Sequence, residues 1–225
     1  MMPATLLTAS RRHRSKSMSQ SEVAYRVLKE KIVTLELPPA TLLNEAELMT
    51  ELDLGRTPIR EALQRLSLEN LVVILPRRGT IVADLNMSDL QKVFELRLEL
   101  ETYSVRFAAA RATHEEIAEM ERLFIDANDI IRNGDYRQLI TLDIEAHRLL
   151  AQAAHNEFLA ETLERLYTHV LRLWYVSLHK VERLQEAIQE HHDIIEAVKA
   201  RDGERAAQIM RAHVSGFQDK FASLL

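Results

Sequence analysis

The distribution of proline and glycine constrains the fold of this chain more than any other feature of its sequence. All five prolines lie at or before position 76, and beyond position 83 glycine occurs only at positions 134, 203 and 216. These two residues disfavour helix interiors most strongly, so their scarcity over about 140 residues predicts a segment that is almost wholly helical. We expect helices over 87–111, 114–132, 136–153, 156–179, 181–200 and 203–223.

The segment before this predicted bundle has the pattern of three shorter helices. Apolar residues at helical spacing predict the first over residues 21–35, and Pro38 and Pro39 stop it. Asn44 followed by Glu47 resembles a capping box, which predicts that a short second helix begins here.

The third helix of this segment has two distinct faces. We expect a turn at Gly55 and a helix that starts at Thr57, which precedes Pro58 and can accept a hydrogen bond from a first-turn amide. Its apolar residues have the spacing of one buried stripe: Ile59, Ala62, Leu63 and Leu66. Its polar residues recur on another face: Arg56, Arg60 and Gln64. Three helices with a tight turn before the last predict a helix-turn-helix, whose last helix enters the DNA major groove. An ordinary solvated surface helix is the alternative.

A basic hairpin is predicted directly after the third helix. Apolar runs over residues 71–75 and 80–83 predict two strands, and the intervening Pro-Arg-Arg-Gly at 76–79 predicts the turn between them. Beside a helix-turn-helix, such a hairpin is a wing whose arginines can reach phosphates or the minor groove. A surface turn without any nucleic-acid contact is the alternative.

Charge separates the two parts of the chain. Residues 1–83 contain 12 Lys or Arg and 9 Asp or Glu, a net charge of +3, whereas residues 84–225 contain 17 and 25, a net charge of −8. Arginines concentrated on one helix and one turn are more typical of a sequence-specific DNA-binding protein than of a protein that coats nucleic acid without specificity. Residues 1–20 are basic and lack an apolar period, which predicts a disordered tail. An upstream start codon ahead of a natural start at Met18 is the alternative.

The composition also excludes several kinds of site. The chain has no cysteine, so disulfides, thiolate metal ligands and cysteine nucleophiles are excluded. No apolar run reaches the roughly 18 residues of a membrane span, and the N-terminus lacks the pattern of a secretory signal. We therefore expect a cytoplasmic protein that does not bind a membrane.

A candidate metal site lies in the predicted bundle. Asp143 and His147 are four residues apart and therefore share one face of a helix. Histidines on two later predicted helices could join them: His191, His192 and His213. One carboxylate and several imidazoles from different helices could bind zinc, nickel or manganese. A surface hydrogen bond between Asp143 and His147, with the other histidines unliganded, is the alternative.

Arg97, in the first predicted bundle helix, is a candidate anchor for the carboxylate of a ligand. A guanidinium can bind a carboxylate through two parallel hydrogen bonds. Pairing with Glu101, four residues later on the same helix, is the alternative.

Several of these motifs, in this order, resemble the GntR family of bacterial transcription regulators. Residues 55–66, with Leu-Glu-Asn-Leu at 68–71 and Arg-Arg-Gly-Thr at 77–80, resemble the winged helix-turn-helix domain of that family. The stretch from Asp143 to His147 resembles the Asp-x-x-x-His metal motif of the all-helical C-terminal domain of the FadR subfamily, called the FCD domain. Further stretches resemble the FCD segments that follow it: 153–156, 190–198 and 210–213.

The resemblance, which covers residues 21–223, implies roles for individual residues. DNA contacts are expected from Arg56, Thr57, Arg60, Arg78 and Gly79. A divalent metal, expected to be Zn with Ni or Mn as alternatives, would be held by Asp143, His147, His191 and His213. Effector contacts are expected from Arg97 and Asn156. Ala46 departs from the family, because many relatives have an arginine there, and this puts one DNA contact in doubt.

One main hypothesis and two rivals follow. The chain is expected to be mainly α, with a disordered basic tail at 1–20, a winged helix-turn-helix DNA-binding domain at 21–83 and an all-helical effector-binding and dimerisation domain at 84–225. We expect a regulator and not an enzyme: a homodimeric repressor that binds a palindromic operator and is controlled by a small organic acid at the metal site. The rivals are a metal-dependent enzyme that uses the Asp/His cluster, and a constitutive DNA-binding protein with a structural metal.

Overall fold

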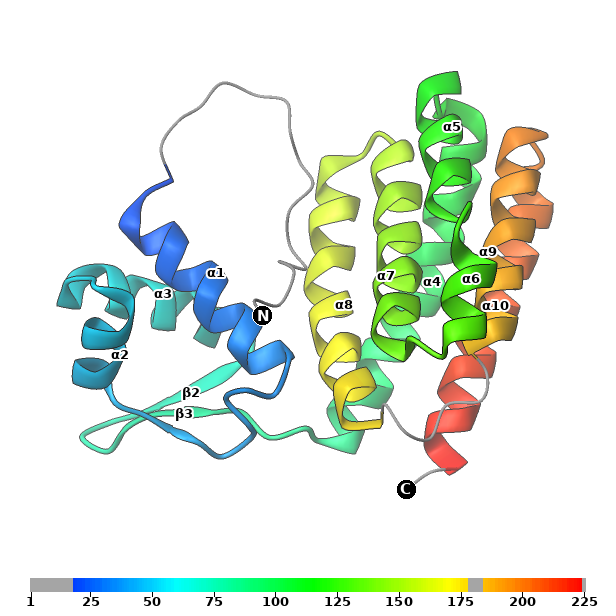
Figure 1. The fold of residues 1–225 in the computed structure, drawn as a ribbon. Helices are drawn as coiled ribbons and strands as arrows, with labels where there is room; N and C mark the ends of the chain where they lie inside the picture. The colour runs from blue at the N-terminus through cyan, green and yellow to red at the C-terminus, as the bar shows by residue number, and fades with distance from the viewer. Residues whose placement is uncertain (1–17, 178–183, 224–225) are drawn as a thin grey trace. The chain divides into compact units, whose positions relative to one another are not determined.

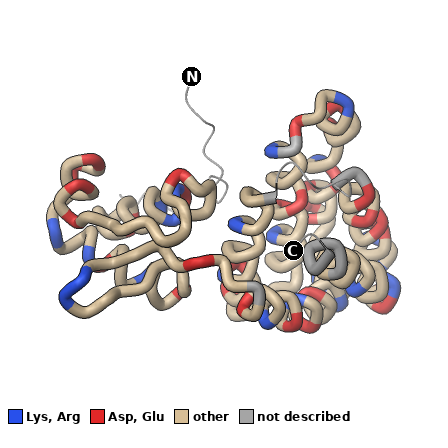
Figure 2. Tube along the Cα trace, turned by 90° about the horizontal axis from the view of Figure 1, so that it is seen from below, with Lys and Arg blue, Asp and Glu red and all other residues tan. Residues whose placement is uncertain are grey.

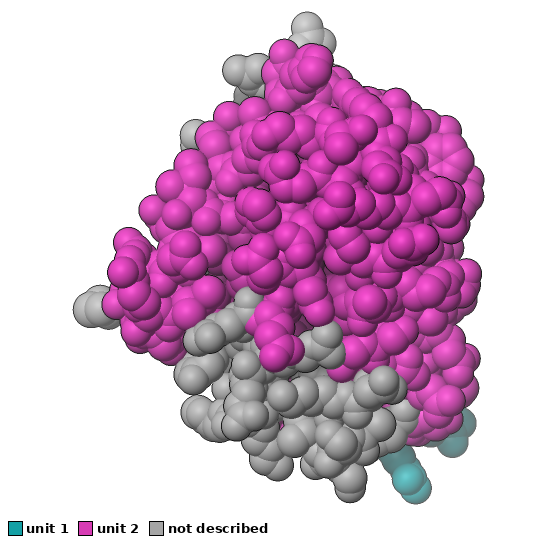
Figure 3. Space-filling view, turned by 90° about the vertical axis from the view of Figure 1, so that its right-hand side faces the viewer, with its two compact units in different colours: residues 1–85 teal, residues 86–225 magenta. Residues whose placement is uncertain are grey.

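The computed structural model describes residues 18–177 and 184–223, and the chain divides into two compact units, 1–85 and 86–225. Figure 1 shows both units as ribbons, and Figure 3 colours them separately. Most of the expected disordered tail, residues 1–17, lies outside the described residues. Within the described ranges, no helix has both the length and the apolar character needed to cross a membrane.

Unit 1 combines three helices with a small antiparallel sheet. Its elements in order are α1 (Gln20–Val33), β1 (Leu42–Leu43), α2 (Glu45–Leu52), α3 (Arg56–Leu68), β2 (Val72–Leu75) and β3 (Gly79–Val82). The predicted helix-turn-helix with its hairpin is therefore confirmed. β1 is an addition: it pairs with β3, so that Leu42 lies opposite Ile81 at the edge of a sheet ordered β1-β3-β2. Two residues are too few to show the alternation that reveals a strand in a sequence.

The predicted apolar stripe of α3 lies in the core of unit 1. All four of its members are buried, and they pack with residues of α1 such as Leu28 and Ile32. α3 begins at Arg56 and its N-cap is Gly55, which makes no side-chain capping bond. The predicted start and cap at Thr57 are therefore wrong. Pro58 is the third helical residue, a position at which its missing amide would have no helical acceptor in any case.

Unit 2 is a bundle of helices, as predicted. Its elements are α4 (Met87–Arg111), α5 (His114–Leu123), α6 (Ala127–Asn133), α7 (Tyr136–Ala153), α8 (Glu157–Ser177), α9 (Leu184–Lys199) and α10 (Gly203–Ser223). The predicted bounds of α4, α7 and α10 agree with the structure. The predicted start at 156 and the predicted end at 200 each differ by one residue from α8 and α9, while the predicted end at 179 and start at 181 fall within residues 178–183, which lie outside the described part.

The helix predicted over 114–132 is wrong, because two helices occupy this segment. α5 ends at Leu123 and α6 starts at Ala127, although no proline or glycine marks the break. Phe124 packs against the bundle core, and its ring stacks on the His191 ring with the centroids 6.1 Å apart. The break between α5 and α6 thus coincides with a long-range contact, whereas local helix propensity alone favours a continuous helix.

α4 is the central helix of unit 2, because α7, α8, α9 and α10 all contact it (Figure 1). Gly203 begins α10 so close to α4 that a Cβ atom there would lie 3.2 Å from the carbonyl oxygen of Arg106. Just after the same, C-terminal end of α4, Thr113 and Glu116 form a reciprocal capping box that starts α5. The absence of a side chain at Gly203 thus allows the start of α10 to pack closely against α4.

Candidate metal centre and nucleic-acid interface

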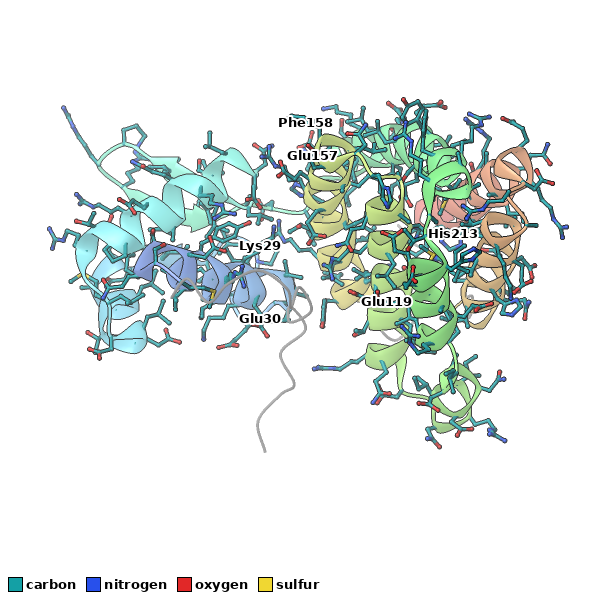
Figure 4. The ribbon with its side chains drawn as sticks, turned by 90° about the horizontal axis from the view of Figure 1, so that it is seen from above. Lys29, Glu30, Glu119, Glu157, Phe158 and His213 are labelled. Carbon is teal, nitrogen blue, oxygen red and sulfur yellow. The ribbon has the colours of Figure 1, made fainter. Side chains whose placement is uncertain are left out.

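Four side chains with metal-binding donor atoms meet inside the bundle. Asp143 and His147 come from α7, His191 from α9 and His213 from α10, and one ligand atom from each lies within 4.8 Å of all the others. All four residues are buried, and Figure 4 labels His213 within the bundle. The predicted grouping is confirmed, and the alternative of a surface Asp–His hydrogen bond is wrong because neither residue is at the surface. His192, the neighbour of His191, is exposed.

The three imidazoles share one feature: the Nδ1 atom of each ring lies next to a hydrogen-bond acceptor. Each Nδ1 faces an acceptor: Ala187 O at 2.8 Å for His191, Glu190 Oε2 at 2.7 Å for His213, and Glu101 Oε2 for His147. An acceptor at Nδ1 keeps the proton there and leaves Nε2 with the lone pair that binds a metal. The Nε2 atoms of His147 and His213 are 3.2 Å apart.

His191 provides the test of whether this group of residues fits a metal. Its side chain is fully buried, and among the described residues its Nε2 has no hydrogen-bond partner. An unsatisfied buried polar atom costs about 1–3 kcal/mol, which a bound metal ion would offset. Burial, followed by the charges of His213 and His147, holds the pKa of His191 well below its usual value. The ring is therefore neutral, the form that ligates metals. One carboxylate with three imidazoles suits a divalent ion such as zinc, nickel or manganese.

A buried ion pair adjoins the cluster. Arg97 Nε donates to Glu101 Oε1 at 2.6 Å, and the other Glu101 oxygen contacts His147. Burial alone would raise the pKa of Glu101, but the charges of Arg97 and His147 lower it to about 2, so the carboxylate is ionised. The Arg97 guanidinium also lies 5.2 Å from the centre of the Tyr167 ring. Pairing of Arg97 with Glu101 is thus the observed arrangement, and its role in effector binding stays a prediction.

Two acidic partners of the cluster were not predicted from the sequence. Glu101 lies on α4 and orients a histidine of α7, while Glu190 lies on α9 and orients a histidine of α10. A carboxylate that adjoins a metal ligand only in space has no signature in linear spacing. The one sequence feature that pointed to either carboxylate was the position of Glu101 four residues after Arg97.

Asn156 has a structural role at the start of α8. Its Oδ1 accepts a hydrogen bond from Leu159 N at 3.2 Å, which caps the first turn of that helix. Within the described part of the chain, no recorded contact joins Asn156 to the four-residue cluster. Its expected contact with an effector stays a prediction.

The exposed face of α3 forms the second candidate site. Arg56 and Thr57 open the helix and are exposed, and Arg60 follows one turn later with 58% of its side chain exposed. Because the N-cap is a glycine, no side chain covers the first-turn amides. A helix start with free amides attracts anions such as phosphate.

The opposite end of α3 is held by side chains of α1. Glu69, directly after α3, accepts from Tyr25 Oη at 2.7 Å and from Lys29 Nζ at 2.8 Å, and Lys29 is labelled in Figure 4. Arg65 donates to Glu22 at 2.6 Å and lies with its guanidinium 3.6 Å from the centre of the Tyr25 ring. These contacts join α1 to the C-terminal end of α3.

The turn of the β2–β3 hairpin is basic and tightly folded. Arg77 and Arg78 lie in this turn and are exposed. The tip of the hairpin is drawn in the blue of Lys and Arg in Figure 2. Arg78 N donates to Leu75 O at 3.1 Å, which closes the turn. Gly79 has a φ of +100°, a backbone conformation that other residues rarely adopt.

The fold and the two sites define a transcription regulator of the winged helix-turn-helix class with a second, all-helical unit. Residues 20–82 match the model of bacterial regulatory proteins of the gntR family, and residues 92–216 match that of the FCD domain. The chain therefore belongs to the GntR family of transcription regulators, in the FadR subfamily with an FCD C-terminal domain. This family consists of regulators and not enzymes, so the enzyme rival is excluded.

Similar proteins agree with this assignment. The HTH-type transcriptional repressor RspR of Escherichia coli is 29% identical over 190 residues, covering 84% of this chain and 83% of RspR. The regulator YdhC of Bacillus subtilis is 30% identical over 193 residues, covering 84% and 85%. Among solved structures, E. coli McbR/YncC has the same fold, with a TM-score of 0.79 at 24% identity over 92% of this chain and 97% of that one.

Proposed function

We propose that this regulator is a homodimeric repressor whose hold on DNA is controlled by a small organic acid that binds at a metal-containing site in unit 2. The buried cluster of Asp143, His147, His191 and His213 carries this proposal. A fully buried set of donors with an unsatisfied nitrogen, in a chain that also presents an exposed arginine helix, supports a ligand site coupled to DNA binding.

In the DNA-binding part of the proposal, α3 enters the major groove and the wing contacts the backbone or minor groove. The proposed contacts come from Arg56, Thr57, Arg60, Arg78 and Gly79. Their exposure in the structure supports this assignment. Two copies of the chain, related by a two-fold axis, would bind the two halves of a palindrome.

In the effector part, the four-residue cluster holds a divalent ion, expected to be Zn with Ni or Mn as alternatives, and the ion supplies positive charge and coordination positions for a carboxylate. Arg97 lies beside the cluster: burial opposes its charge, but Glu101, Tyr167 and Asp143 together raise its pKa. Its Nε is occupied by Glu101, and the other guanidinium N–H groups are the proposed donors to an effector carboxylate. Asn156 is kept as a second proposed contact.

Repression that is released by the effector is the proposed direction of control. RspR and GlaR of E. coli, which is 28% identical over 198 residues, are both named transcriptional repressors. An effector can weaken DNA binding only to the extent that it binds the DNA-free form more tightly.

The test measures DNA affinity with and without metal and organic acids. A duplex selected from a random pool by the full chain serves as the operator, and its affinity is followed by fluorescence anisotropy. We expect one class of di- or tricarboxylic acid to weaken binding of the zinc-loaded protein at least tenfold, and to have no effect after chelation. Asp143→Asn should keep operator binding and lose the response. If no acid changes the affinity of the metal-loaded protein, control by an organic acid is wrong and the constitutive rival is favoured.

A further inference from the structure

Glu45, the first residue of α2, makes a direct contact with the exposed face of α3. Arg60 Nε lies 2.9 Å from one Glu45 carboxylate oxygen and 3.1 Å from the other, so both oxygens accept from the same N–H group. The pair joins the two helices of the helix-turn-helix at the position where α3 presents its arginines. Sequence spacing does not predict this contact, since the two residues lie on different helices.

Stability does not explain the pair. The side chains of Arg60 and Glu45 are 58% and 33% exposed, and exposed ion pairs contribute little to folding. α3 is already fixed by its buried stripe and by the contacts of Arg65 and Glu69 with α1. A carboxylate near a DNA-binding surface also repels phosphate. The contact therefore calls for an explanation other than stability.

The geometry of the contact leaves one edge of the Arg60 guanidinium available. This group has one N–H on Nε and four on the two terminal nitrogens Nη1 and Nη2. Glu45 occupies the Nε edge, and among the residues that the structure describes neither terminal nitrogen of Arg60 has a recorded partner. Reading a guanine requires two parallel donors aimed at its O6 and N7 atoms, and the terminal pair of nitrogens provides them.

We propose that Glu45 is a specificity-determining positioning residue for the proposed DNA-binding function: it holds the Nε edge of Arg60 so that the terminal nitrogens read one guanine in each half of the operator. Without Glu45 the long arginine side chain would sample several rotamers and contact phosphates as readily as bases. Glu45 therefore lowers general attraction to DNA and increases discrimination at one base pair.

The neighbouring Glu47 provides a matched control. It lies on the same helix and carries the same charge, but it accepts from the Asn44 side-chain amide at 3.0 Å, next to the N-cap bond that Ala46 N donates to Asn44 Oδ1. Glu47 is thus held at the helix start and makes no recorded contact with Arg60 in the described structure. Replacing either glutamate by glutamine removes one negative charge, and only one of the two changes affects the Arg60 contact.

The experiment selects bound duplexes from a random pool with four full-length proteins: the parent, Glu45→Gln, Glu47→Gln and Arg60→Ala. The parent and Glu47→Gln should select the same motif. Arg60→Ala should lose the preference for guanine at one position of each half-site, by roughly 5- to 150-fold. Glu45→Gln should weaken the preference at that same position about tenfold, leave the other positions unchanged, and bind random duplex at least as tightly as the parent.

Three outcomes would overturn the inference. If Glu45→Gln selects the parent motif with unchanged discrimination, Glu45 does not position Arg60. If it weakens all sequences equally, its role is structural, because partial unfolding scales every affinity by the same factor and cannot change a single base preference. A parent protein that selects no motif would overturn the proposed DNA-binding function, and this inference with it. The first two outcomes leave that function intact.

Discussion

At the scale of single residues, the candidate metal centre includes carboxylates that contact its histidines but are not themselves among the four candidate ligands. The Glu101 carboxylate contacts His147 with one oxygen and accepts from Arg97 with the other, and the residue is buried. Such outer contacts fix which nitrogen of a histidine carries the proton. Glu101 thus connects the proposed effector anchor with the proposed metal ligand His147.

Glu101→Gln is expected to weaken zinc binding about 10- to 100-fold, because the amide can donate to His147 Nδ1 and move the imidazole proton to Nε2. Competition against a chromophoric chelator measures this affinity. Glu164→Gln is the control, since Glu164 pairs with Arg148 and not with a ligand histidine. His147→Ala should lose more affinity than Glu101→Gln. Unchanged zinc affinity in a folded Glu101→Gln protein would remove Glu101 from the centre.

At the scale of elements, the wing depends on the backbone of Gly79. Its φ of +100° allows the tight turn that places Arg77 and Arg78 at the tip. A Cβ atom added there would lie 3.4 Å from Leu42 Cδ1, a flexible side-chain end, so backbone strain and not a clash is the main cost of substitution. β1 pairs with β3 at the next two residues, Thr80 and Ile81, which is why the unpredicted strand matters for the wing.

Gly79→Ala is expected to destabilise unit 1 by about 1–3 kcal/mol, the usual cost of a residue held in a disfavoured conformation. Chemical denaturation measures this change, and DNA affinity should fall as well because the tip shifts. Gly134→Ala is the matched control: Gly134 also has positive φ, at +66°, but it ends α6 and has no atoms within 4 Å of an added Cβ. Equal DNA affinity in the two variants would argue against a contact of the wing with DNA.

At the scale of the whole molecule, the two units have separate hydrophobic cores. The core of unit 1 is built from residues before position 83, and that of unit 2 from residues after position 89. The four-residue cluster belongs entirely to unit 2. A ligand that binds only the folded bundle stabilises that bundle by mass action.

Zinc at 100 times its dissociation constant should therefore stabilise unit 2 by about 2.7 kcal/mol. Hydrogen exchange of the full chain, with and without chelator, resolves the two units. Slower exchange is expected in α7, α9 and α10, with little change over residues 20–82. His213→Ala should show no zinc-dependent protection. Protection that is equal in both units, or absent from these three helices, would contradict a metal site in the bundle.

The amino-acid sequence by itself determined the features that depend on neighbours along the chain. The lack of proline and the scarcity of glycine specified the helical unit, the four-residue spacing of Asp143 and His147 placed two candidate ligands on one face, and the apolar stripe specified the buried side of α3. Each of these depends on helix periodicity, which a linear sequence displays directly.

Only the tertiary structure decided the features that depend on contacts between distant segments. The break at Phe124, the pairing of β1 with β3, the carboxylates beside the histidines and the contact between Glu45 and Arg60 all join residues that no repeating pattern relates. The physical reason is that such contacts depend on how helices pack, and a packing energy is a property of two surfaces and not of one segment. The proposed reading of a guanine therefore rests on a glutamate that only the folded chain brings to its arginine.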